Sequence, residues 1–311
     1  MTPALFVDPQ LLRLTVAIAA PFVVAALGEL LMERSGVLNV GIEGMMAVGA
    51  AVGFLVAWSS GSYPAGLAAA LLAGAALGLV LAYYGVALRG PQLTVGLGLL
   101  VFGLGLASLL YRAVVGVQLA APRVPVLPPL PIAGLAGLPV LGDVLFSQDA
   151  LVYLAFILVP AVHLVLFATP LGLRLRACGE NPRAADTVGV NVARMRCAAT
   201  LVGSALIGLA GAYLPLTITG GYSDGIVGGR GWIALMLVIL ARWLPWAVVA
   251  GALLFAYVEA LQFRLALATK ALPPQLLLAL PYLLAIVVLT RVYRGAQAPA
   301  AVGQPYDREA R

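Results

Sequence analysis

The chain gathers charged side chains in one stretch near its middle, residues 171–196. Five arginines and two acids lie there: Arg174, Arg176, Arg183, Arg194 and Arg196, with Glu180 and Asp186. No nucleophile–base pair stands out there or elsewhere in the chain, so no catalytic chemistry is predicted. Apolar runs flank it on both sides, and a short arginine-rich loop between two membrane spans is expected on the cytoplasmic side. We therefore predict a cytoplasmic loop over residues 171–196.

A short helix is predicted inside this loop. Asn181 can cap free backbone N–H groups, and Pro182 suits the first position of a helix. Gly189 is a plausible stop, which gives a two-turn helix over Pro182–Val188. A helix this short is marginal by itself in water, so it is expected to dock on a partner.

A second group of polar residues interrupts the apolar runs. Ionisable groups inside a membrane are costly, and are either functional or paired within a helix bundle. The candidates are Glu29, Glu33, Arg34, Glu43, Asp224, Arg230 and Glu259. A structural role is favoured for Glu29, Glu33, Arg34 and Glu259. For Asn39, Glu43, Asp224 and Arg230, which lie in glycine-rich segments, structural pairing and a place along a transport path remain equally open. Trp232 could stack on a flat ligand, although anchoring at the membrane surface is favoured.

Metal, cofactor and nucleotide chemistry is not predicted. The cysteines are Cys178 and Cys197, and His163 is the single histidine, which leaves too few ligands for a zinc or iron site. No G-x-x-x-x-G-K-[ST] sequence is present to form a phosphate-binding loop. The chain is therefore expected to be no enzyme, and transport would draw on an ion gradient or on a separate energy-supplying subunit.

Composition sets the class of protein. The 311 residues are 63% hydrophobic and 10% charged, against about 25% charged in soluble domains. Apolar runs fill nearly the whole length, which predicts an all-α, polytopic transmembrane bundle built as one domain over residues 1–311. The net charge of +6 is interpreted as the charge of cytoplasmic loops and not as a nucleic-acid-binding surface.

About nine spans, within a range of eight to ten, are expected between residues 11 and 291. They are 11–32, 37–58, 65–88, 93–115, 149–168, 197–219, 232–244, 246–268 and 275–290. Counting from a cytoplasmic basic loop places the N-terminus outside. The density of prolines over residues 116–148 excludes a continuous helix, so this segment is expected to form an extracytoplasmic loop. The tail over residues 295–311 is expected to be cytoplasmic and disordered.

The two halves of the chain share a pattern. Each contains a polar, glycine-rich interruption, an apolar span, a short turn and an Ala/Gly-rich span. The interruptions begin near Gly36 and Gly220, and an odd number of spans separates them. The halves are therefore expected to be inverted repeats, whose interrupted helices mark a transport path near the middle of the bilayer.

Four segments carry a resemblance to a known family: GELLMERSGVLNVGIEGMM at 28–46, GLRLRACGENPRAADTVGVNV at 172–192, GSALIGLAGAYL at 203–214 and GRGWIAL at 229–235. Together they resemble the inner-membrane permease of bacterial ATP-binding-cassette (ABC) importers of the ribose/branched-chain amino acid class. The nearest branch imports nucleosides, with a basic-membrane-protein-type lipoprotein receptor, or simple sugars.

The resemblance implies a mechanism and partners. The helix near 182–188 would be the coupling helix, with coupling residues Glu180, Asn181, Pro182, Ala184, Ala185, Asp186 and Gly189. The candidate residues of the substrate path come from the residues themselves and not from the resemblance; they are Asn39, Glu43, Asp224, Arg230 and Trp232, with Gln92 added where the chain departs from the family's pattern. Implied partners are a cytoplasmic ABC ATPase, a second homologous permease, an extracytoplasmic substrate-binding lipoprotein and membrane lipid. The alternative hypothesis is an ion-coupled secondary transporter that uses Glu43 or Asp224.

Overall fold

A computed structural model describes residues 8–116, 121–268, 274–292 and 297–308. These residues form helices, without strands, so the predicted all-α class is confirmed. The helices are α1 (Pro9–Ser35), α2 (Ile42–Ser60), α3 (Tyr63–Leu81), α4 (Gln92–Val115), α5 (Leu141–Leu145), α6 (Ala150–Ala168), α7 (Pro170–Glu180), α8 (Pro182–Thr187), α9 (Val192–Tyr213), α10 (Arg230–Leu240), α11 (Pro245–Ala268), α12 (Pro274–Leu278) and α13 (Leu280–Val292). Two π-helical segments, Ala82–Ala87 and Leu214–Thr219, extend α3 and α9.

The nine predicted spans correspond to seven long helices and two short ones in the part of the chain that the structure describes. Within the described ranges, seven helices are long and apolar enough to cross a membrane, and two shorter apolar helices accompany them at 230–240 and 276–288. The shorter pair occupies the positions of the seventh and ninth predicted spans. The 11 residues of α10 cover only about half of a ~30 Å hydrocarbon core. Because glycine-rich residues 220–229 form an irregular segment in place of helical turns, this pass is an interrupted one.

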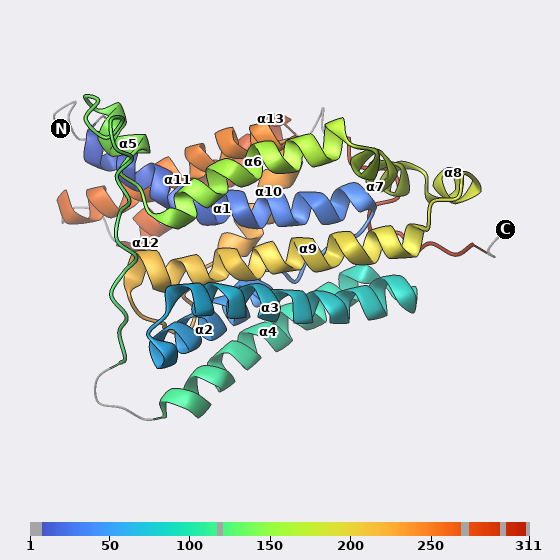
Figure 1. Cartoon of the computed structure of the whole chain (residues 1–311), viewed down its shortest axis with the longest axis horizontal. Helices are drawn as coiled ribbons and strands as arrows, with labels where there is room; N and C mark the ends of the chain where they lie inside the picture. Colours follow the sequence, from blue (N-terminus) through green and yellow to red (C-terminus); the bar gives the residue numbers. More distant parts are fainter. Residues whose placement is uncertain (1–7, 117–120, 269–273, 293–296, 309–311) are drawn as a thin grey trace.

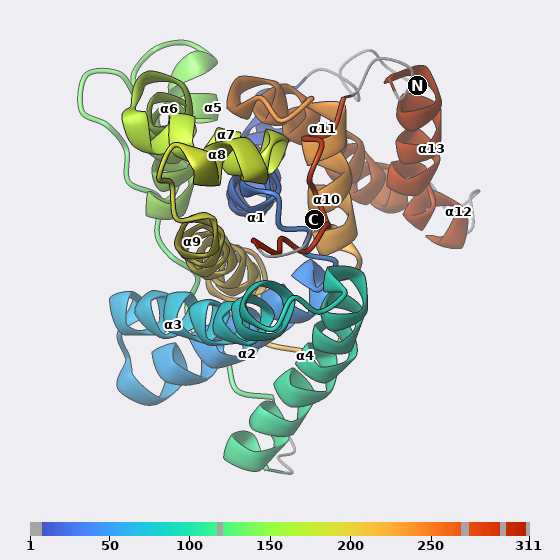
Figure 2. The same cartoon turned by 90° about the vertical axis from the view of Figure 1, so that its right-hand side faces the viewer.

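Helix α1 lies at the centre of the bundle, where 89% of its most apolar 18-residue stretch is buried. It packs against α6, α10 and α11 on one side and against α9 on the other, while α2, α3 and α4 form a group beside α9 (Figure 2). Glycines permit the closest approach, because a Cβ atom at Gly28 or Gly203 would collide with the backbone of the other residue. Small residues therefore bring α1 and α9 together, as is usual for membrane helices.

The two ends of the bundle carry different features (Figure 1). Helix α8 and the C-terminus lie at one end, and α5, the extended residues 121–140 and the N-terminal end of α1 lie at the other. The extended chain is held by backbone hydrogen bonds, including Val124 N–H to Gly220 O at 2.8 Å and Leu130 N–H to Gln148 O at 2.8 Å. The predicted proline-rich loop is thus irregular and holds one short helix.

The two interrupted helices run in opposite directions (Figure 1). Helix α2 starts beside Gly231 and runs towards the end that carries residues 121–140. Helix α10 starts at the same place and ends at Leu240, three residues before Trp243, whose carbonyl accepts from Arg34 in the last turn of α1. This opposition agrees with the predicted inversion of the two halves.

The expectation of a disordered C-terminal tail is wrong for residues 297–308, which pack against the α8 end of the bundle. Ala301 N–H donates to Gly179 O at 2.8 Å, and Gly303 N–H donates to Gly36 O at 3.2 Å. Both acceptors belong to residues at or just beyond a helix end, where carbonyls lack partners within their own helix. The tail supplies those missing donors, a contact that composition alone does not reveal.

Candidate functional site

The first candidate site is the corner formed by α7 and α8. Helix α7 is capped by Thr169, whose hydroxyl accepts from Gly172 N–H at 3.1 Å. Helix α8 is capped as predicted, because Asn181 Oδ1 accepts from Ala184 N–H at 3.0 Å. Gly189 follows with φ +85°, a left-handed conformation that ends the helix at low cost. The predicted two-turn helix is therefore present, and it ends at Thr187.

One face of α8 is turned inward. Ala185 is 2% exposed and packs with Cys178 and Val192, so a partner protein has no access to it. Asp186 is half-buried, and its carboxylate accepts from the Tyr306 hydroxyl at 3.1 Å. Two of the predicted coupling residues thus face the protein's own chain.

The opposite face of α8 is exposed. Of the predicted coupling residues, Glu180, Asn181, Ala184 and Gly189 are exposed, and Pro182 is half-buried. Three exposed residues are not among the predicted coupling residues: Arg183, Thr187 and Val188, the last 78% exposed. The sequence signal that could have singled out Val188 is an apolar side chain directly after a polar, capped helix.

A buried arginine ties this corner to the bundle. Arg196 was predicted to be a loop charge, but it is 1% exposed. Its guanidinium donates to the carbonyls of Ser35 at 3.1 Å, Cys178 at 3.3 Å and Gln304 at 2.7 Å. Burial raises the pKa of the Cys178 thiol, and the nearby Arg196 partly opposes that rise. Burial and then the hydrogen bond to Asp186 raise the pKa of the Tyr306 hydroxyl.

The second candidate site is the interruption between α1 and α2. Asn39 and Gln92 are 0% and 1% exposed. Gln92 Oε1 accepts from Leu38 N–H at 2.8 Å, and Asn39 Oδ1 accepts from Gly41 N–H at 2.9 Å. Glu29 accepts from Asn39 N–H at 3.0 Å. These side chains satisfy backbone groups that the broken helix leaves free, as buried N–H groups require.

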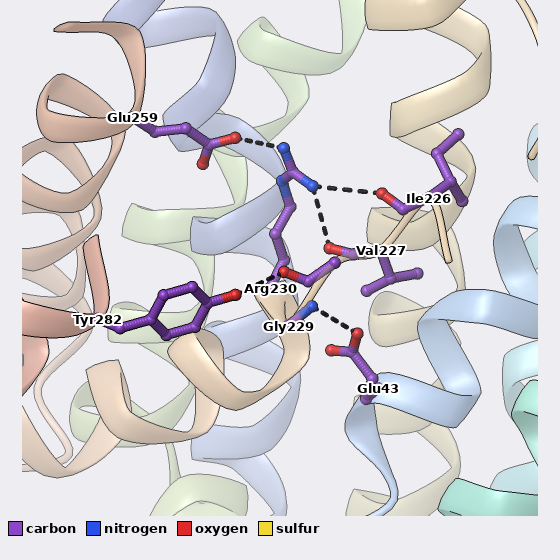
Figure 3. Close-up of polar contacts among 8 residues, drawn as sticks. Glu43, Ile226, Val227, Gly229, Arg230, Glu259 and Tyr282 are labelled. Atoms are coloured by element: carbon purple, nitrogen blue, oxygen red, sulfur yellow. Dashed lines mark hydrogen bonds and ion pairs between the residues drawn. The ribbon is translucent and has the colours of Figure 1, made fainter. Parts of the chain in front are cut away.

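The interruption before α10 meets the start of α2 at Glu43 (Figure 3). The two carboxylate oxygens of Glu43 accept from Gly229 N–H at 2.7 Å and from Gly231 N–H at 2.8 Å. Glu43 also lies in the first turn of its own helix. Its charge therefore sits at the N-terminal ends of two helices, where both helix dipoles favour an anion. Gly231 has no room for a Cβ atom, which would lie 2.6 Å from Glu43 N.

Arg230 lies beside this junction and is paired (Figure 3). Its guanidinium forms an ion pair with Glu259 and donates to the carbonyls of Ile226 at 3.2 Å and Val227 at 3.0 Å. Tyr282 donates its hydroxyl to Gly228 O at 2.9 Å. The structure thus brings Glu43 and Arg230 together around residues 228–231.

Of the other predicted path residues, Asp224 lies apart from the junction, whereas Trp232 directly follows Gly231 in the first turn of α10. Asp224 is near the end of α4, where it pairs with Arg112 at 2.9 Å and accepts from Ser108 at 3.2 Å. Trp232 is 43% exposed. Among the residues that the structure describes, no group of three or more His, Cys, Asp or Glu is arranged to hold a metal ion.

These features, a bundle of membrane-length helices with two opposed interrupted helices and a capped helix at one end, fit a membrane permease. Residues 12–289 match the family described as the permease component of branched-chain amino acid transport systems. The chain belongs to this family of ABC transporter permeases.

Three relatives cover nearly the whole chain. The glucose ABC transporter permease protein TsgC13 of Haloferax volcanii, whose name marks glucose as a provisional assignment, is 37% identical over 96% of this chain and 98% of its own. The guanosine permease NupQ of Bacillus subtilis is 34% identical over 94% of each chain. The nucleoside permease NupC of Lactococcus lactis is 32% identical over 93% of each. No solved structure matches the chain significantly.

Proposed function

We propose that this multi-pass membrane protein is the permease subunit of an ATP-driven importer in the bacterial inner membrane. Its cargo is a nucleoside, with simple sugars as the second candidate class. Two of the near full-length relatives are named for guanosine and nucleosides, and one is named for glucose. Cargo would be delivered by an extracytoplasmic binding lipoprotein, and a second homologous permease would complete the path.

The observation that carries the proposal is the two-faced helix α8. Its inner face is fixed to the bundle through Ala185, while its outer face exposes Ala184, Thr187 and Val188 to solvent. A helix of 6 residues has too few hydrogen bonds to be stable alone, so its fixed position depends on packing. A rigid, projecting helix with an apolar tip suits insertion into a groove of a cytoplasmic ATPase.

The interrupted helices supply the second part of the mechanism. Their polar side chains are engaged with backbone groups at the α1–α2 interruption and at the start of α10. A transport cycle that separated these segments would free Glu43, Asn39 and Gln92 to line a path. We infer that they switch between these two sets of partners, and that motion of α8 drives the exchange.

The test uses the reconstituted assembly of permease, ATPase and binding protein in proteoliposomes. A184W and V188D alter only the exposed face of α8, and both should lower nucleoside uptake at least tenfold, while ATP hydrolysis continues. The matched control is A193W, an exposed alanine at the start of α9, outside α8. Wild-type uptake in both α8 variants would contradict the coupling role.

The same vesicles test the energy source and the cargo. Uptake should require ATP inside the compartment that holds the ATPase, and guanosine, adenosine and uridine should compete better than ribose or glucose. Uptake by the permease alone, driven by an ion gradient, would instead identify a secondary transporter.

A further inference from the structure

The C-terminal residues 297–308 cross the end of the bundle that carries α8 (Figure 2). They contact three elements that are far apart in the sequence: the α7–α8 corner, the α1–α2 interruption and the turn before α4. The third contact is an ion pair, Arg89 to Asp307 at 2.8 Å. A segment that was expected to be disordered is thus bonded to both candidate sites.

Several contacts bind the tail to the α7–α8 corner. On the inner face of α8, Asp186 Oδ2 accepts from the Tyr306 hydroxyl at 3.1 Å and pairs with Arg308 Nε at 3.0 Å. At the end of α7, Glu180 Oε2 accepts from Ala300 N–H at 3.3 Å. The Tyr306 ring also packs against the small apolar cluster that contains Ala185.

Other contacts bind the same segment to the α1–α2 interruption. Gly303 N–H donates to Gly36 O at 3.2 Å, and the two residues that follow Gly36 lead directly to Asn39. Arg196 links the C-terminal segment to the end of α1, because its guanidinium donates to Ser35 O at 3.1 Å and to Gln304 O at 2.7 Å. Only two residues of the tail, Gln304 and Pro305, therefore separate Gly303, which is bonded to the interruption, from Tyr306, which is bonded to α8.

We propose that residues 297–308 form a linkage that transmits movement of α8 to the α1–α2 interruption, with Asp186, Tyr306 and Arg308 as its positioning contacts. The proposal rests on the coupling role given to α8 above. When α8 is displaced, the Asp186 contacts pull on the tail, and its bond to Gly36 moves the segment that carries Asn39. Tyr306 and Arg308 touch no cargo; they act through α8.

The test measures the number of ATP molecules hydrolysed per nucleoside imported, in the reconstituted full-length assembly. The double variant Y306F/R308A removes both donors to Asp186 and should raise this ratio at least threefold. In the variant Y306F/R308K the lysine keeps the ion pair with Asp186, so most of the coupling should be restored. R194A, which removes an exposed arginine from the start of α9, is the charge-matched control and should leave the ratio unchanged.

Two further variants distinguish a failure of the linkage from a failure of the proposed function. R308E changes a side chain that is 77% exposed, so folding does not depend on it, and its charge repels Asp186. A raised ratio in R308E supports the linkage, and a wild-type ratio in both R308E and Y306F/R308A overturns it. A184W is measured in parallel: uncoupling by A184W alone removes the linkage and leaves the proposed function standing. Wild-type behaviour of A184W removes the proposed function itself.

Discussion

At the scale of residues, the polar side chains inside the membrane are engaged with backbone groups. Glu43 receives two N–H groups from the start of α10, and Gln92 and Asn39 receive N–H groups from the α1–α2 interruption. Interrupting a helix leaves backbone groups without partners, and the hydrocarbon region offers no water to replace them. The charged and amide side chains therefore make the interruptions possible.

Replacing Glu43 should lower the thermal stability of the protein, because its carboxylate accepts two buried backbone N–H groups. E43A leaves Gly229 N–H and Gly231 N–H without acceptors, at a cost of about 1–3 kcal/mol for each buried group. E43Q keeps one good acceptor and should lie between E43A and the wild type. Thermal unfolding of the purified protein in detergent gives the order of melting temperatures, and equal values for E43A and the wild type would contradict this role.

The Arg230–Glu259 pair allows a second prediction. The two side chains are 18% and 10% exposed, so removal of one partner leaves a largely buried charge. R230A should destabilise the protein by about 3–5 kcal/mol, whereas the double replacement R230M/E259M should cost much less. A double-mutant cycle on thermal stability measures the difference. Additive losses in the two single variants and the double variant would show that the pair is not coupled.

At the scale of elements, much of the fold could be predicted from the sequence. The ends of α4 and α6, the cap and stop of α8, and the opposed interruptions follow from apolar runs, Asn181, Gly189 and glycine-rich segments. Three features could not be predicted, because each depends on partners distant in the sequence. They are the packed tail, the buried position of Arg196 and the inward face of α8, which is set by contacts of Ala185 and Asp186 with other segments.

The sequence alone also does not distinguish glycines at which two helices are in contact from glycines that lie away from other helices. Gly203 on α9 lies against Gly28, so G203L should force α1 and α9 apart, at a cost of at least about 1–3 kcal/mol. A Cβ atom at Gly105 on α4 would meet no atom of another described element within 4 Å, and G105L should be tolerated. The yield of monodisperse protein after detergent extraction distinguishes the two. Loss of both variants, or of neither, would contradict the packing described for α1 and α9.

At the scale of the whole molecule, we predict that the two ends face different compartments. Helix α8 and the tail lie at one end and residues 121–140 at the other (Figure 1). In intact cells, a membrane-impermeant maleimide should label L138C but not V188C, and permeabilised cells should allow labelling of both. Labelling of V188C from outside would show the opposite orientation in the membrane and would contradict the proposed import function.

Cys178 provides an internal control for the same labelling. Burial shields its thiol and raises its pKa, and because the thiolate is the reactive form, little of it reacts near neutral pH. The folded protein should therefore react more slowly at Cys178 than at V188C, and the rate at Cys178 should increase as the pH rises. Mass spectrometry of the labelled peptides measures both rates. Equal rates at neutral pH would contradict the burial of the α7–α8 corner.

The central claim is that the exposed face of α8 touches the ATPase. It is tested most directly by placing a photo-crosslinking amino acid at Val188 and illuminating membranes that contain the assembled transporter. The prediction is a covalent product between permease and ATPase that is absent when the same group replaces Leu138. A product at position 138 and none at 188, with the assembly intact, would contradict the account.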